Sequence, residues 1–419
     1  MISVKKVFQC TILFYIFWGA CAWFTWDFEL NPILRHSANA ITVLISFLYV
    51  RTYHVKLNID AIKFIAIISL FTVYVFHGIS LLSPLLFFLR FFLLYVVWCD
   101  KNHIAEHLRF CRKWIAFIVT PGLVLHLFFV VVGVIPSFIS IHPNSPTYVF
   151  YNYIALLEDV NQFGLPRYKS IFLEPGYFGT LLAFLLYATR FNLKDKVGKM
   201  LLLDLIFTVS LAGYITAFLG YTYHLYEEKR LGRKGISILL GLVVTYLVSI
   251  NYNNGDNIIN RGIIERLQVD EEKGISGNNR TGQFALDYFD MMVSSGEIWY
   301  GIGHQGVTRI NGGNNSDGNY FNQIRGAGYV IYFITNGIFC ALLCLLIYFC
   351  LSIFNTSCNK KYAFGFLLIV FLTFLQVATP LSYSWLLLFI MGCTNNVPCL
   401  TNIYAGKKKY NLYISRRGN

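Results

Sequence analysis

Charged residues are scarce in this chain: Asp, Glu, Lys and Arg together make up 13% of its 419 residues. Hydrophobic residues make up 56% and aromatic residues 17%, and the mean hydropathy is +0.55. Soluble domains of this length are not so apolar, whereas polytopic membrane proteins are. The composition therefore excludes a single soluble core and predicts an integral membrane protein.

Several motifs of soluble enzymes and pumps are missing. The chain has no P-loop, no GxSxG elbow and no Rossmann fingerprint, because the Gly-x-Gly at 301–303 follows no βαβ strand and opens onto a loop. ATP-driven transport and serine hydrolysis are therefore disfavoured. No His-Glu-x-x-His motif or paired Asp cluster stands on the predicted outer face, and the ten cysteines show neither disulfide nor metal spacing. We predict no cofactor and no metal.

Apolar runs near the length of a membrane span divide the chain. They predict an all-α polytopic membrane protein with a single membrane domain over residues 1–419 and about 12 transmembrane helices. The stretch 201–226 is too long for one span and has basic flanks, which indicates a hairpin turning at Ala212-Gly213. The predicted spans are 7–26, 33–50, 60–82, 84–99, 114–135, 171–190, 199–212, 213–227, 236–250, 326–354, 362–378 and 381–396.

The net charge of +13 would suggest a nucleic-acid partner in a soluble chain. In a membrane protein the cytoplasmic loops collect Lys and Arg instead. If the N-terminus lies inside, most of the 34 Lys and Arg fall in short inner loops. We therefore predict no nucleic-acid partner and two cytoplasmic termini, with the basic segment 407–417 facing membrane lipid.

Two predicted outer loops, 136–170 and 251–325, are much longer than the turns. Loops of this length are usually functional or disordered. The second loop is rich in Gly and Asn, and its alternating stretches 258–267 and 283–292 predict short amphipathic helices. We therefore expect a large extracytoplasmic loop domain at 251–325.

One carboxylate, Glu174, lies one turn inside an apolar segment, immediately before a proline and a glycine. A charge at that depth is costly and usually marks function, and the Pro-Gly pair loosens the start of the helix. Arg90 lies in mid-span and would either neutralise Glu174 or bind a lipid phosphate. His77 and His126 also lie in predicted spans, where we expect hydrogen bonds to other helices.

Arginines are frequent in the two long loops. A guanidinium group grips phosphate oxygens two at a time and keeps its charge, so such a set suits a pyrophosphate that joins a sugar to a lipid. The alternative is that these arginines are solvated or paired with the acidic residues of 265–272. His304 is either a proton carrier or an ordinary polar surface residue. The candidate arginines are Arg167, Arg261, Arg266, Arg280, Arg309 and Arg325.

The order of these elements resembles the bacterial O-antigen polymerase (Wzy-type) family, within the superfamily that includes the O-antigen ligases. An outer loop enters a helix through a Phe-Leu-Glu-Pro-Gly motif that contains Glu174, and a short hairpin of spans follows near 210–213. The large outer loop then has an early Arg280, a Gly-x-Gly, and the pair Asn319-Tyr320 just before the next span. The resemblance covers 165–355 by motif and the whole chain by hydropathy.

The resemblance implies a metal-independent glycosyltransferase of the GT-C type in the bacterial cytoplasmic (inner) membrane. It implies that a glycan passes from an undecaprenyl-pyrophosphate carrier to the end sugar of another lipid-linked repeat unit, building O-antigen of lipopolysaccharide or capsular polysaccharide. A chain-length regulator protein would be a further partner. Arg280 matches the loop arginine of the family and Glu174 the acidic residue of its Glu-Pro motif. Asn319 falls in a His-Asn pair of many members, but Gly318 stands here in place of the histidine.

Glu174 and Arg280 are thus the candidate catalytic residues, although Glu174 has the alternative of a structural pairing with an arginine. The candidate substrate-binding residues are Arg90, Arg167, Arg261, Arg266, Arg309, Arg325, His304, Asn319 and Tyr320. Two other functions stay open: ligation of a finished glycan to a lipid acceptor, and a flippase or transporter for the same glycans. Transporters usually show paired repeats with broken helices in both halves, and this pattern is absent here, which favours an enzyme.

Overall fold

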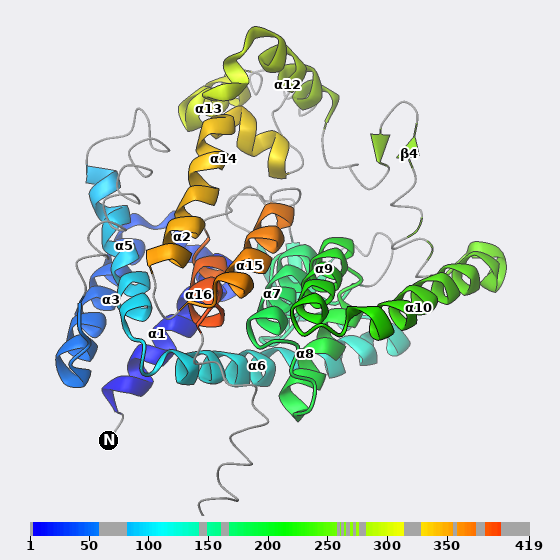
Figure 1. Cartoon of the computed structure of the whole chain (residues 1–419). Helices are drawn as coiled ribbons and strands as arrows, with labels where there is room; N and C mark the ends of the chain where they lie inside the picture. Colours follow the sequence, from blue (N-terminus) through cyan, green and yellow to red (C-terminus); the bar gives the residue numbers. More distant parts are fainter. Residues whose placement is uncertain are drawn as a thin grey trace, which may run out of the picture.

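The structure is a computed structural model, and the described part of the chain is mostly helical (Figure 1). It comprises residues 3–57, 82–141, 149–160, 167–257, 260, 264, 269–270, 274–275, 282–313, 328–354, 358–373 and 382–394. The first half contains α1 (Val4–Gly19), η1 (Trp23–Thr25), α2 (Trp26–Leu30), α3 (Pro32–Tyr53), α5 (Leu82–Cys99) and α6 (Ile104–Val132). The second half contains α7 (Pro175–Ala188), α8 (Lys196–Phe207), α9 (Leu211–Glu227), α10 (Leu231–Asn251), η2 (Tyr252–Gly255), α12 (Gln283–Ser295), η5 (Glu297–Trp299), α13 (Gly303–Gly313), α14 (Gly328–Phe354), α15 (Lys360–Thr373) and α16 (Tyr383–Gly392).

Three described helices are long and apolar enough to cross a membrane: α3, α6 and residues Gly328–Ile353 of α14. The prediction of a helical membrane protein is confirmed at this level. Each predicted span in the described residues overlaps a helix, while most of the predicted span 60–82 lies outside them.

The side chains next to a helix explain where it begins. At α3, for example, Pro32 occupies the first turn and the Asn31 side chain accepts hydrogen bonds from two backbone N–H groups.

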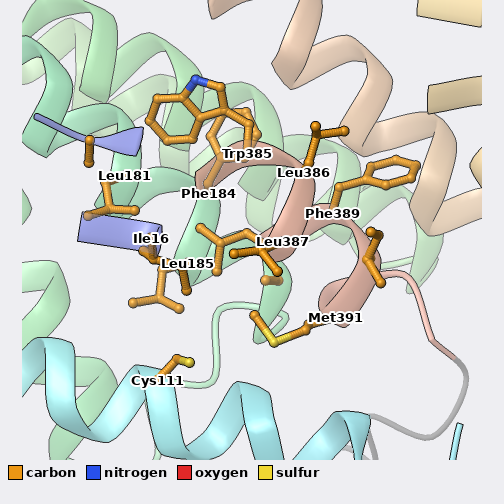
Figure 2. Close-up of a cluster of buried hydrophobic side chains, with 14 of the residues drawn as sticks. Ile16, Cys111, Leu181, Phe184, Leu185, Trp385, Leu386, Leu387, Phe389 and Met391 are labelled. Carbon is orange, nitrogen blue, oxygen red and sulfur yellow. The ribbon is translucent and has the colours of Figure 1, made fainter. Parts of the chain in front are cut away.

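The core is built around α7, which is buried on nearly every side. All its residues from Phe178 to Ala188 are buried, as expected of a helix that is apolar all round. It packs against α9 and α16, and α16 also packs against α1. Figure 2 shows Leu181, Phe184 and Leu185 of α7 beside the side chains of α16. Protein, rather than lipid, therefore surrounds this short apolar helix.

The loop after α6 contains a small sheet, so the all-α prediction is incomplete. Strands β1 (Phe138–Ile141), β2 (Val149–Asn152) and β3 (Leu157–Asp159) pair antiparallel in that order, with Ser140 opposite Phe150 and Tyr151 opposite Glu158. Strands this short leave no mark in a hydropathy profile that is read for spans of 20 residues. A second antiparallel pair joins β4 (Val269–Asp270) to β5 (Gly274–Ile275).

The stretch 201–226 is divided between two helices, α8 and α9, as predicted, but the break occupies 208–210 and not Ala212-Gly213. Ser210 caps α9 because its hydroxyl oxygen accepts a hydrogen bond from the N–H of Gly213 at 3.2 Å. Gly213 lies inside α9 and faces Gly179 of α7, where an added Cβ would lie 2.9 Å from the Gly179 backbone. This glycine therefore serves a close contact between two helices, as small residues do in membrane proteins.

A second core joins the large loop to α14. Met292 of α12 and Ile298 of η5 pack with Val330 and Ile334 of α14. The predicted short helix at 283–292 is confirmed as α12, whereas the stretch 258–267 lies mostly outside the described residues. The Gly-x-Gly at 301–303 opens into helix α13 and not onto a loop, which corrects the prediction.

At Gly301 the backbone of the large loop lies against the backbone of α14. It has φ +72°, and a Cβ there would lie 2.6 Å from the backbone nitrogen of Gly337, where α14 is broken with φ 76° and ψ 169°. The N–H of Ile302 donates to the carbonyl of Ile334 at 2.9 Å. Both glycines are therefore needed for the backbones to meet.

Replacing Gly301 with Ala should loosen α12, η5 and α13 from α14, because the left-handed conformation alone costs an L-residue about 1–2 kcal/mol. We expect hydrogen exchange of residues 282–313 to become about 5- to 30-fold faster in purified protein. Gly282→Ala is the matched control, since that residue has φ −66° and open space around its Cβ position. Equal exchange in the two variants would contradict this account.

Candidate functional site

The segment 167–174, which leads into α7, is tied down by backbone hydrogen bonds. The N–H of Leu173 donates to the carbonyl of Cys21, and the N–H of Trp23 donates to the carbonyl of Ile171, so this segment pairs with the residues that follow α1. On its other side the N–H of Leu157, at the start of β3, donates to the carbonyl of Ser170 at 2.8 Å. The segment therefore has a defined path although it belongs to no helix.

Glu174 is the residue that precedes the first turn of α7. It has extended backbone angles, φ −136° and ψ 148°, and Pro175 follows it at the first helical position. The Glu174 carboxylate is half-buried and does not accept a capping hydrogen bond from the first turn. It is therefore held at the start of a buried helix without being used to cap it.

Lys169 brings a buried positive charge to the same segment. Its side chain is 3% exposed, its Nζ lies 2.7 Å from Oδ1 of Asp159, and it lies 4.1 Å from the centre of the Phe150 ring. Burial lowers the pKa of the Lys169 ammonium, while the charges of Asp159, Glu158 and Glu174 oppose that shift. Lys169 thus joins the acidic end of β3 electrostatically to Glu174.

Glu158, the neighbour of Asp159 on β3, pairs with His126 of α6. Nδ1 of His126 and Oε1 of Glu158 are 2.5 Å apart, and both side chains are buried. The ring of Tyr168 lies 5.4 Å from the His126 ring, and its hydroxyl donates to the carbonyl of Val119. His126 was expected to bond to another helix, but its partner belongs to a strand. The buried acid on the strand needs such a partner, and α6 supplies it.

Arg167 begins the segment and reaches the turn between α8 and α9. Its Nε donates to the carbonyl of Val209 at 3.1 Å. Val209 has φ 44° and Ser170 φ 50°, and Ile154, just before β3, has φ 70°. Positive φ is unusual for β-branched residues, and strained backbone of this kind gathers at functional sites. Val209 and Ile154 are β-branched, and Ser170 lies within the segment 167–174 that leads into α7.

This chain was compared with protein families, curated proteins and solved structures. No model of a protein family, no curated protein and no solved structure matches this chain. The resemblance to the O-antigen polymerases therefore stays a prediction from the motifs.

The structure brings together only some of the predicted site residues. Glu174 and Arg167 lie on one segment, whereas Arg309 is exposed on α13, which packs against α14 (Figure 1). His304 lies in the first turn of α13 and Arg90 on α5, and only their backbones are described. The remaining candidates lie outside the described residues: Arg261, Arg266, Arg280, Asn319, Tyr320 and Arg325.

Sequence reasoning missed the ionic cluster beside Glu174, formed by His126, Glu158, Asp159 and Lys169. The signal was the acidic pair Glu158-Asp159 in a loop otherwise poor in acids, although their partners could not be read from it. In the described part of the chain no group of three or more His, Cys, Asp or Glu is placed to hold a metal ion. Chemically, the cluster offers two acids and two bases, of which His126, Glu158 and Lys169 are buried while Asp159 is exposed.

The His126–Glu158 pair gives a stability test. Replacing His126 with Leu removes the 2.5 Å hydrogen bond and leaves a buried acid, so we expect a loss of about 3–5 kcal/mol of folding free energy. The double variant H126L/E158L should recover most of it, because a buried pair can be replaced by apolar side chains at little cost. Thermal unfolding in detergent, followed by size-exclusion chromatography, measures both. A single variant as stable as the wild type would show that the pair is not formed.

Proposed function

We propose that this chain is a glycosyltransferase of the bacterial cytoplasmic membrane that polymerises oligosaccharide repeat units carried on undecaprenyl pyrophosphate. In this proposal about 12 helices span the membrane in a GT-C-type arrangement, both termini are cytoplasmic, and the reaction takes place on the outer face. The substrates are two lipid-linked glycans, one the donor and the other the acceptor.

One observation carries the proposal: a half-buried carboxylate, Glu174, starts a buried apolar helix, and two cationic side chains, Arg167 and Lys169, lie in the segment just before it. Glycosyl transfer from a pyrophosphate carrier needs these two kinds of group. The acceptor hydroxyl must lose a proton, which a carboxylate in a partly desolvated setting can take. The pyrophosphate gains negative charge as it leaves, and nearby cations stabilise that charge.

The backbone at the first turn of α7 also favours a negatively charged group. Backbone dipoles place a partial positive charge at a helix start, which favours an anion there. The Glu174 side chain does not cap this turn. Lys169 is held by Asp159 in the anchored segment, so its charge is pre-positioned.

The reaction we propose is a direct displacement. The acceptor oxygen attacks the anomeric carbon of the donor sugar as its proton passes to Glu174, and the bond from that carbon to the phosphate oxygen breaks with inversion. Undecaprenyl pyrophosphate leaves with the bonding electrons. Arg280, Arg261, Arg266 and Arg309 of the large loop are proposed to hold the pyrophosphate, and Arg167 and Arg325 to stand at the mouth of the substrate cavity.

Replacing Glu174 with Gln tests the proton acceptor. With purified protein in detergent and lipid-linked repeat units as substrate, we expect polymer formation to slow about 10²- to 10⁴-fold, because removing a general base costs that much. Glu297→Gln is the control, since it removes the same charge from an exposed residue of η5. Polymer formation by E174Q at the wild-type rate would exclude Glu174 as the base.

Surface glycans of a strain that lacks this chain distinguish the possible functions. Loss of the polymerase should leave single repeat units attached to the lipid acceptor on a gel. Loss of a ligase would leave no attached glycan, and synthesis of polymer by the purified protein would exclude a pure transporter. Arg280→Ala should reproduce the single-repeat pattern at an unchanged protein level, and normal chain lengths in that variant would refute its role.

A further inference from the structure

Two cysteines meet where α15 begins and α16 ends. Cys358 lies two residues before the start of α15, and Cys393 directly follows the last residue of α16. Cys358 forms an isolated antiparallel bridge with Thr394, and the N–H of Asn359 donates to the carbonyl of Cys393 at 2.7 Å. Cα atoms opposed in such a pairing lie about 4.5–5.5 Å apart, and a disulfide joins Cα atoms about 4.4–6.8 Å apart. The two cysteine backbones are therefore neighbours at a spacing that a disulfide can bridge.

The thiols of these two residues are in contact and largely covered. Both are free thiols, and the Cys393 thiol donates a hydrogen bond to the Cys358 sulfur. Cys358 is 8% exposed and Cys393 2% exposed. This burial keeps out reagents of the size of glutathione, so the oxidant that suits the pair is a small one such as hydrogen peroxide.

The surroundings of Cys358 favour the thiolate, which is the reactive form. The hydrogen bond from Cys393 lowers the pKa of the Cys358 thiol, and the charge of Lys360 lowers it further, while burial opposes both. Cys358 also precedes the first turn of α15, where backbone dipoles place a partial positive charge. Asn359 fixes that turn, because its Oδ1 accepts a hydrogen bond from the N–H of Tyr362 at 3.2 Å. A thiol of lowered pKa beside a second thiol is the arrangement of redox-sensing cysteines.

The pair belongs to a part of the chain that the charge distribution assigns to the cytoplasm. Cys358 and the basic residues Lys360 and Lys361 lie in the short loop between the predicted spans 326–354 and 362–378. Cytoplasmic thiols are kept reduced, and the disulfides that form there are usually transient and redox-sensing. A reversible disulfide is therefore the form that suits this location.

The pair also lies beside the buried helix α7. A Cβ on Gly392, the neighbour of Cys393, would lie 2.8 Å from the Cα of Ala188, the last residue of α7. Both α15 and α16 pack against α7. A bond between the two cysteines would therefore tie together two helices that enclose this core helix.

We propose that Cys358 and Cys393 form a reversible disulfide in response to hydrogen peroxide. The Cys358 thiolate attacks one oxygen, the O–O bond breaks, and the departing hydroxide takes a proton and leaves as water, so that Cys358 becomes a sulfenic acid. The Cys393 sulfur then attacks the Cys358 sulfur, the S–O bond breaks, and the hydroxide leaves with the Cys393 proton as a second water. Two thiols are oxidised and one peroxide is reduced to two waters. The proposal does not depend on the proposed glycosyltransferase activity, and its test needs no activity assay.

Mass spectrometry of chymotryptic peptides tests the proposal on the purified full chain in detergent, treated with hydrogen peroxide and then alkylated. We expect a disulfide between Cys358 and Cys393 that dithiothreitol reverses. C393S should lose this disulfide and give a sulfenic acid at Cys358, which dimedone traps. C358S should leave Cys393 as an alkylated thiol, and a dimedone adduct there would overturn Cys358 as the attacking thiol.

The matched control is C399S, which removes the next cysteine along the chain and should leave the disulfide unchanged. Cys340 and Cys344 of α14 are the internal control. Both sulfurs lie 3.0 Å from the Tyr332 hydroxyl within a predicted span, and we expect them to stay reduced. Full alkylation of Cys358 and Cys393 after peroxide treatment of the wild type would overturn the proposal. Pairing of Cys358 with Cys399, or equal oxidation of Cys340 and Cys344, would also overturn it.

Discussion

The structure depends on the burial of α7. This short apolar helix is enclosed by other helices, and its backbone comes close to that of α9 where Gly179 faces Gly213. Lipid tails are as apolar as leucine, so such contacts rest on close packing and not on exclusion from water. Because α7 lies inside the protein, Glu174, the residue just before its first turn, can present a carboxylate to protein groups and to a substrate instead of to hydrocarbon.

The buried polar groups near α7 are stabilised by partners to which they are hydrogen-bonded or paired. Lys169 has Asp159, and Glu158 has His126, so each buried charge or acid has a partner within 2.7 Å. A buried pair often adds little stability compared with apolar side chains of the same size, so its presence calls for another reason. The proposed reaction supplies one, because a proton acceptor and fixed cations are what transfer from a pyrophosphate needs.

Local patterns predicted the helices well and the connections poorly. The apolar runs placed α7, and the alternating pattern at 283–292 placed α12, because each depends only on neighbouring residues. The sheet β1–β3 was missed because its strands are three or four residues long. A turn was predicted at Ala212-Gly213 because the apolar stretch 201–226 is too long for one span and has basic flanks, whereas Gly213 lies inside α9 and contacts α7. The roles of the arginines at 261–280 stay predictions.

The amino-acid sequence by itself determined that the chain is a helical membrane protein and that Glu174 belongs to an apolar segment, although it placed Glu174 one turn inside the helix and not just before the first turn of α7. Both follow from composition and from the length of apolar runs, which are local properties. Only the tertiary structure decided which groups meet Glu174 and its neighbours. His126 and Glu158 are 32 residues apart, and Arg167 meets a carbonyl 42 residues away. No periodic pattern encodes such pairs, because they depend on how the helices and the small sheet pack around α7.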